Sequence, residues 1–205
     1  MTTGARETSG SGGDVRSRIL EAAARRFVAS GYHGISMREI ADDAGLSKPA
    51  LYYHFRDKES LFLAILEDAV ERLASLLDAC EAEPTCRARL GVLLEGLFDW
   101  SPERRAVIRL ASQEITHLDP AVRGDFIHRY HAAFVDRIRD FIGQGVESGE
   151  LREVDPGRAA WLLLGMIYPF MLSVRSSGAE GPERLVLDVF FRGLEDRGQG
   201  QARGG

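Results

Sequence analysis

The sequence predicts an all-α protein of about nine helices. Three observations support this fold class: prolines number only seven in 205 residues, no run of alternating β-branched residues occurs, and long stretches are rich in Ala, Leu, Arg and Glu, which are good helix formers. A chain of this length suits one compact helical unit or two small ones. We expect a disordered arm at 1–13, a three-helix domain at 14–60, a helical bundle at 61–196 and a disordered tail at 197–205.

The chain opens with residues that bury little, and Arg6 is the only cation of the arm, so we expect a passive tail there. A first helix is predicted from about Asp14 to Ser30, because apolar residues recur at every fourth position. These residues are Val15, Ile19, Ala23 and Phe27. Gly31 ends this helix, and its arginines fall mostly off the apolar stripe, where solvation is their expected role.

Two short helices separated by a tight turn follow. Ser36 with Glu39 three residues later forms a capping box, which starts the first of them. Gly45 ends it, because glycine adopts the left-handed backbone of a helix C-terminus at least cost. Ser47 offers the next N-cap, and Pro49 fits the first turn of the second helix. The arrangement is a helix-turn-helix, whose second helix enters the major groove of DNA.

The residues of this stretch carry a family pattern without a gap. The matching positions are Ser36, Ile40, Ala41, Ala44, Gly45, Leu46, Ser47, Leu51, Tyr52, His54, Phe55, Lys58 and Leu61. They resemble the DNA-binding signature of TetR-family transcriptional repressors, which begins with Thr or Ser and continues as I-A-x-x-A-G-[VL]-S and L-Y-x-H-F-x-x-K-x-x-L. The resemblance covers the whole architecture in general terms and is specific in the first 60 residues.

This resemblance implies which residues meet DNA. Sugar-phosphate contacts are expected from Ser36, Ser47, Tyr53, His54 and Lys58, and base-edge contacts from Arg38, Lys48 and Ala50. Hydroxyls and a lysine at a helix start suit phosphates, whereas Lys or Arg donates to guanine and Ala50 meets only a thymine methyl. Tyr52 either contacts DNA or packs under the second helix, while Leu51 and Phe55 belong to the core.

The net charge of −5 does not by itself favour a DNA partner. Its distribution is more informative, because residues 14–60 hold eight Arg and Lys against seven Asp and Glu, and residues 61–205 hold seventeen against twenty-three. The only two lysines, Lys48 and Lys58, both lie in the helix-turn-helix stretch. An acidic body repels DNA from other faces and so orients the encounter.

Asp57 is expected to cap a long amphipathic helix from Lys58 to about Cys80. Five helices follow it, and a proline after Ser101, Asp119 and Asp155 marks the start of three of them. Their approximate spans are Thr85–Trp100, Pro102–His117, Asp119–Glu147, Asp155–Ser176 and Pro182–Asp196.

The stretch 159–172 is apolar nearly all round, which predicts burial on more than one side. Within it, Pro169 is expected to kink the helix and Gly165 to permit a close approach. In the TetR family the last two helices pair with their copies across a two-fold axis. A matching apolar face is offered by Leu185, Val186, Val189 and Phe190. A monomer core is the alternative; a homodimer is favoured, because it places two recognition helices ~34–36 Å apart on one DNA face.

Aromatic and polar side chains of the bundle predict a pocket for a hydrophobic or amphipathic small molecule. The expected ligand-binding residues are Trp100, Gln113, His117, Phe126, Tyr130, Phe134, Trp161, Met166, Tyr168 and Phe170. Core filling alone explains any single aromatic among them.

Two alternative functions remain open from the sequence. The first is a metal-responsive regulator. Glu114 and His117 are three residues apart, as are His128 and His131, so each pair shares a helix face and could bind a divalent ion. Satisfied or exposed histidines are the default, and neither a metal site nor a cofactor is expected. A helical-bundle enzyme is the other alternative, although the chain lacks a nucleophile elbow, a phosphate loop and a dinucleotide fingerprint.

The resemblance thus implies a cytoplasmic, homodimeric repressor that binds a palindromic operator in double-stranded DNA and is released by a small molecule. No apolar run reaches membrane-spanning length and no signal peptide is evident, so no membrane partner is expected. Cys80 and Cys86 are expected to be reduced and partly buried.

Overall fold

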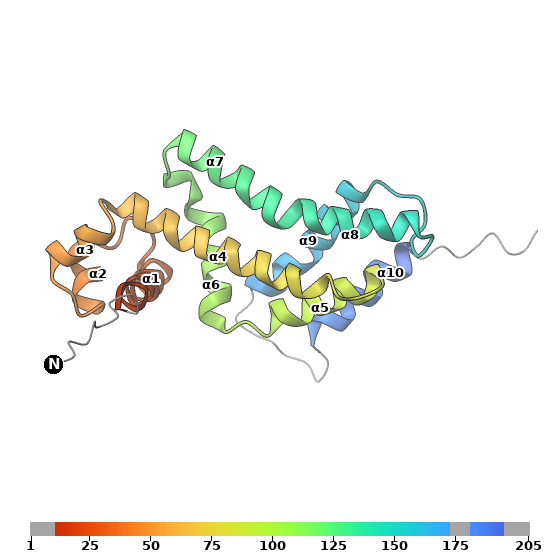
Figure 1. The fold of residues 1–205 in the computed structure, drawn as a ribbon, viewed down its shortest axis with the longest axis horizontal. Helices are drawn as coiled ribbons and strands as arrows, with labels where there is room; N and C mark the ends of the chain where they lie inside the picture. The colour runs from red at the N-terminus through yellow and green to blue at the C-terminus, as the bar shows by residue number, and fades with distance from the viewer. Residues whose placement is uncertain (1–10, 173–180, 195–205) are drawn as a thin grey trace, which may run out of the picture. The chain divides into compact units, whose positions relative to one another are not determined.

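A computed structural model describes residues 11–172 and 181–194, and these residues are helical apart from turns and short connections (Figure 1). They divide into two compact units. The first comprises Met1–Asp68 together with Leu110–Arg123, and the second comprises Ala69–Arg109 together with Gly124–Gly205, within the described ranges. The all-α prediction is confirmed, and no described helix is both long and apolar enough to cross a bilayer.

The first unit contains α1 (Ser11–Ser30), α2 (Met37–Asp43), α3 (Lys48–His54) and the start of α4 (Lys58–Cys80) (Figure 1). Its core is built from side chains of all four helices that are fully buried. They are Ile19, Ala23, Phe27, Ile40, Leu51, Leu61 and Phe62. Aromatic rings meet there, since Phe27 stacks on Tyr32 at 5.8 Å and meets Phe62 edge-on at 5.5 Å between ring centroids.

The predicted caps of the first unit are confirmed. The Ser36 amide donates to the Glu39 carboxylate at 2.9 Å, and the Ser36 hydroxyl accepts from the Glu39 amide at 3.3 Å. Gly45 follows with a φ of 66°, in the left-handed region that favours glycine. Ser47 caps α3 by accepting from the Ala50 amide. Local sequence therefore fixes where α2 ends and α3 begins.

The first helix starts earlier than expected. α1 begins at Ser11, whereas the sequence placed its start near Asp14 and assigned residues 11–13 to a disordered arm. The helix takes in Gly12 and Gly13, and Asp14 still lies in its first turn, where an acidic side chain favours the helix dipole. The rest of the predicted arm, and the predicted tail at 197–205, lie outside the described residues.

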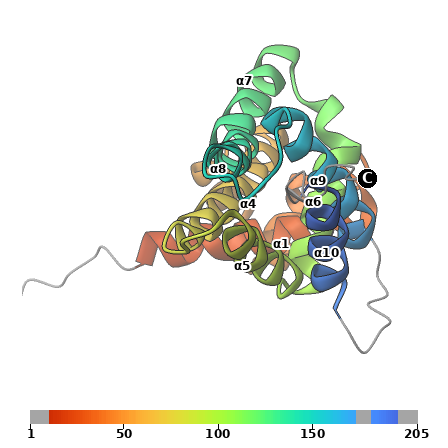
Figure 2. The same ribbon diagram turned by 90° about the vertical axis from the view of Figure 1, so that its right-hand side faces the viewer.

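The second unit contains the end of α4 and most of the helices that follow it. These are α5 (Cys86–Phe98), α6 (Pro102–Glu114) as far as Arg109, α7 (Pro120–Tyr130) from Gly124, the π-helical turn η2 (His131–Val135), α8 (Asp136–Glu147), α9 (Pro156–Leu172) and α10 (Pro182–Leu194). The 3-10 turn η1 (Ile115–His117) belongs to the first unit, as do the end of α6 and the start of α7. Within the unit, α5 packs against α8 and α10, and α9 packs against α8 and α10 (Figures 1 and 2). The predicted caps Ser101, Asp119 and Asp155 all accept from backbone amides at their helix starts. Thr85, which the sequence placed inside its helix, is instead the N-cap of α5 and accepts from the Ala88 amide.

Two expected features of this unit differ in detail. The prediction of a single helix at 119–147 is wrong, because η2 interrupts it. The spacing of the apolar residues gave no indication of a π turn. Both cysteines are free thiols, as expected, but they are fully rather than partly buried. Burial raises the pKa of Cys80 to about 11 and that of Cys86 to about 12. Such thiols stay protonated and unreactive near neutral pH.

The start of α5 is held by a carboxylate from a distant loop. Glu150 accepts hydrogen bonds from the backbone amides of Cys86 at 2.7 Å and Arg87 at 2.8 Å. Two orphan donors of the helix N-terminus are thereby satisfied by one negative charge, which the helix dipole also favours.

We predict that Glu150→Ala lowers the free energy of unfolding by about 1–3 kcal/mol, because two part-buried amides lose a charged acceptor. Denaturant titration followed by circular dichroism measures this loss. The matched control is Glu147→Ala, an exposed glutamate on the neighbouring helix, which should cost less than about 0.5 kcal/mol. Equal losses for the two variants would contradict the role assigned to Glu150.

Candidate DNA-binding surface and ligand cavity

The outer face of α3 carries exposed polar side chains. Tyr53 is 87% exposed, Tyr52 is 42% exposed, and Ser47 and Lys48 are also exposed. Leu51, on the opposite face, is fully buried and fixes the orientation of the helix. The predicted contact residues Ser36 and Arg38 of the preceding helix start are exposed as well, and Ala50 is half-buried.

Tyr52 was predicted either to contact DNA or to pack under α3, and in the structure its ring packs against Lys48. Its ring lies beneath the Lys48 ammonium, with Nζ 5.7 Å from the ring centroid. This cation–π contact restrains Lys48 on the outer face of α3. Tyr53 meets the half-buried ring of His54 edge-on at 5.4 Å. Tyr52 therefore positions the lysine expected to meet base edges, while Tyr53 packs against His54.

Lys58 differs from the other predicted DNA contacts. It is half-buried, its ammonium donates to the Ile35 carbonyl at 3.0 Å, and it lies 4.7 Å from the centroid of the Tyr32 ring. In this arrangement Lys58 joins the start of α4 to the turn before α2. Its charge remains close to the helix-turn-helix, and one of the three N–H donors of its ammonium is used within the unit.

Two arginines of α1 have structural roles that sequence reasoning did not assign. Arg26 forms a bidentate ion pair with Asp43, in which Nη2 lies 2.6 Å from Oδ1, and this lowers the pKa of the Asp43 carboxyl. Arg16 lies over the Phe55 ring at 5.3 Å. The pairs tie α1 to α2 and to the end of α3, a relation that needs three-dimensional proximity to be seen.

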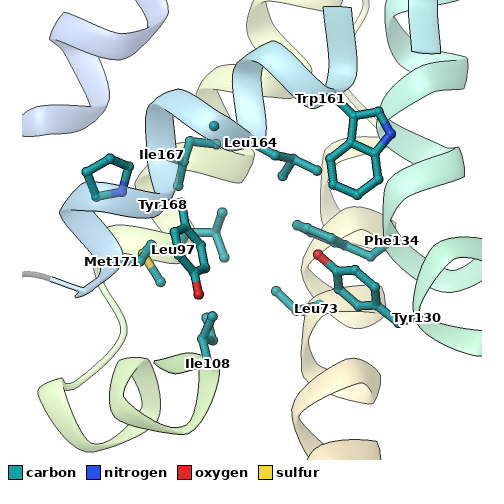
Figure 3. A pocket seen from close by; sticks show the side chains of 12 residues that line it. Leu73, Leu97, Ile108, Tyr130, Phe134, Trp161, Leu164, Ile167, Tyr168 and Met171 are labelled. Carbon is teal, nitrogen blue, oxygen red and sulfur yellow. The ribbon is translucent and has the colours of Figure 1, made fainter. Parts of the chain in front are cut away.

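The second unit contains a cavity of about 370 Å³ (Figure 3). Four of the predicted ligand residues lie on its wall: Tyr130, Phe134, Trp161 and Tyr168. The other wall residues, which sequence reasoning missed, are Leu73, Leu97, Ile108, Leu164, Gly165, Ile167, Pro169 and Met171. Aliphatic residues of this kind cannot be told from core in a sequence. Only Gly165 and Pro169 carried a signal, as points of close approach and kinking.

Six predicted ligand residues are not on this wall. Phe126 is buried elsewhere, Trp100 and Met166 pack half-buried against the core, and Phe170 meets Phe98 edge-on at 6.4 Å. Gln113 and His117 belong to the first unit. For α9 the reason is helical geometry, because Met166 and Phe170 follow Leu162 at steps of four and so share a different side from Trp161, Gly165 and Tyr168.

The four residues of the metal alternative do not form a site. Across the described residues, no group of three or more His, Cys, Asp and Glu side chains is placed to hold a metal ion. Glu114 and His117 lie in the first unit, where His117 Nε2 is 3.1 Å from the Glu114 carboxylate and Nδ1 is 3.0 Å from His33 Nε2. Both imidazole nitrogens are thus occupied by other partners. In the second unit, the His131 ring meets Trp161 edge-on at 5.6 Å.

Comparison with known proteins finds a family match for the N-terminal part of the chain and another for the C-terminal part. Residues 19–65 match the model of bacterial regulatory proteins of the tetR family, and residues 83–186 match that of the tetracyclin repressor-like C-terminal domain. The first match covers the helix-turn-helix, and the second covers all of the twelve cavity-wall residues except Leu73.

Individual relatives agree with these matches. The chain is 34% identical over 148 residues to the HTH-type transcriptional activator FasR of Mycolicibacterium smegmatis. The matched stretch covers 71% of this chain and 67% of that protein. It is 28% identical over 166 residues to the HTH-type transcriptional repressor AcnR of Corynebacterium glutamicum, and this match covers 80% of this chain and 83% of that protein.

A solved structure extends the likeness to the fold. The crystal structure of AibR in complex with isovaleryl coenzyme A and operator DNA superposes with a TM-score of 0.72, at 25% identity, over 88% of this chain and 98% of that one. With a signature helix-turn-helix, a helical second unit and relatives that match both, the chain belongs to the TetR family of bacterial transcriptional regulators.

Proposed function

We propose that this ligand-responsive DNA-binding regulator binds a palindromic operator as a homodimer and leaves it when a hydrophobic or amphipathic small molecule enters the cavity of the second unit. The observation that carries the proposal is the outer face of α3, where Lys48 and the 87% exposed Tyr53 stand opposite the fully buried Leu51. A regulator of this kind works where the chromosome is, so we assign it to the bacterial cytoplasm.

The DNA contacts divide by chemistry. The Tyr53 hydroxyl and the exposed Ser36 and Ser47 at helix starts suit sugar-phosphate, which sets register without reading sequence. Lys48 and Arg38 carry donors that suit guanine O6 and N7 in the major groove, and Lys48 is restrained by the Tyr52 ring. We assign Lys58 mainly to supporting the turn at Ile35, with its charge acting on the phosphates at longer range.

We predict that Lys48→Ala weakens binding to the best operator by about 1–3 kcal/mol and relaxes preference at one base pair, because a base-edge donor is lost. Tyr53→Phe should weaken all sequences alike. The operator is first selected from random DNA by the wild-type protein, and fluorescence anisotropy at fixed salt then measures affinity for single-base variants. Arg158→Ala removes an exposed cation from the second unit and should leave binding within about twofold. Uniform weakening by Lys48→Ala would contradict base reading.

The dimer proposal rests on exposed apolar side chains of the last two helices. Leu162 on α9 is 65% exposed, and Leu185 and Val189 on α10 are 59% and 53% exposed. Leu185 and Val189 are four residues apart and share one face of α10. α9 and α10 pack against each other within the unit. A second copy of the same surface would cover these exposed side chains, as a two-fold interface requires.

We predict that the double variant Leu185→Glu, Val189→Glu is monomeric and weakens palindrome binding at least about 100-fold, because two charges would be buried without partners. Sedimentation velocity measures the mass, and circular dichroism checks that the helices remain. The matched control is Ile127→Glu on α7, an apolar side chain 40% exposed outside α9 and α10, which should stay dimeric. A dimeric double variant would show that another surface holds the subunits together.

The response to ligand is proposed as a population shift between two dimer states. A ligand that binds the non-DNA state more tightly weakens DNA binding, and a coupling of ~1–3 kcal/mol corresponds to about 5–150-fold. The chain passes from one unit into the other within α4, α6 and α7, and we propose that these helices carry the coupling. We propose repression rather than activation by analogy with AcnR, which is named a repressor. FasR, in contrast, is named an activator.

A further inference from the structure

We infer that the cavity of the second unit takes an electrically neutral, lipophilic molecule with one hydroxyl or carbonyl oxygen, held between the phenols of Tyr130 and Tyr168. The inference rests on the proposed function, in which this cavity is the site of the releasing ligand. It goes further by naming the charge and the polar group of that ligand.

The wall of the cavity is apolar and uncharged. Among the described residues, twelve line it, and none of them is Asp, Glu, Lys, Arg or His. A carboxylate or ammonium placed there would lose part of its hydration without gaining an opposite charge, which is unfavourable. A neutral molecule avoids this cost. It would also cover apolar wall surface that is open to solvent, such as the Trp161 ring, which is 52% exposed.

Two phenols are the strongest hydrogen-bonding groups on the wall. Tyr130, at the end of α7, and Tyr168, on α9, stand on opposite sides of the cavity (Figure 3). Burial raises the pKa of Tyr130 to about 12, and the nearby Tyr168 adds to the effect, so the phenol keeps its proton. A phenol donates one hydrogen bond and also accepts. The pair therefore suits a carbonyl, which accepts from both, or a hydroxyl, which accepts from one and donates to the other.

The volume is consistent with a ligand of modest size. About 370 Å³ lies near the lower end of the ~300–1,000 Å³ typical of small-molecule pockets. Gly165 lies on the wall, and a Cβ added there would meet no other atom within 4 Å. A larger side chain at this position would therefore occupy ligand space without disturbing the packing of α9.

The test uses probes of equal chain length and different charge. 1-Decanol, 2-decanone and decanoate are each titrated at pH 8 against the neutral fluorophore N-phenyl-1-naphthylamine bound to the intact protein. We expect the alcohol and the ketone to displace it at least ~10-fold more effectively than decanoate, which is charged at this pH. The double variant Tyr130→Phe, Tyr168→Phe should bind 1-decanol roughly 3- to 10-fold more weakly and the fluorophore unchanged.

Two results would overturn the inference: decanoate binding as tightly as 1-decanol, or unchanged 1-decanol affinity in the double tyrosine variant. Gly165→Leu should abolish binding of all probes, whereas Gly124→Leu, at an exposed glycine of α7 with equal room for a side chain, should not. Failure of the fluorophore to bind would also overturn it. None of these measurements involves DNA. A failure of the proposed repression would instead appear as unchanged operator affinity with 1-decanol bound.

Discussion

The burial of one face of α3 is the constraint on which the DNA-binding surface depends. A helix of seven residues is too short to be stable alone in water. Leu51, fully buried, and Phe55, which lies under Arg16, fix it to the core of the first unit. Because side chains on a helix point in fixed directions, anchoring this face turns Lys48 and Tyr53 outward. The orientation of the proposed DNA contacts therefore depends on a small apolar anchor.

The second unit faces a different constraint, which is to keep an apolar space within a packed helical core. Its wall combines bulky rings with a glycine and an internal proline of α9, so the helix leaves room where a regular leucine-rich helix would fill it. The π turn η2 begins directly after Tyr130 and contains Phe134, and these are the two aromatic residues that this part of the chain contributes to the wall. Irregular turns of this type are frequent at functional sites.

The chain also separates its charge from its cavity. Lysines occur only at the helix-turn-helix, and the cavity wall has none of the charged residues that are abundant elsewhere. A polar, exposed surface is suited to phosphates and base edges, whereas an uncharged cavity is suited to a molecule that prefers to leave water. The two proposed sites of this regulator thus differ in the interactions that bind their partners, which are electrostatic and hydrogen-bonding at α3 and hydrophobic in the cavity.

Local signals in the sequence determined the caps at Ser36, Ser47, Asp57 and Asp155 and the left-handed turn at Gly45, because these depend on neighbours a few residues away. They also determined the all-α class and, through the family signature, the DNA-binding role. Only the tertiary structure decided which aromatic residues meet at the cavity, that Lys58 supports Ile35, and that His33 meets His117 across 84 positions of sequence. Apolar burial is non-directional, so sequence spacing tells which side of a helix is apolar but not which distant side chain will pack there.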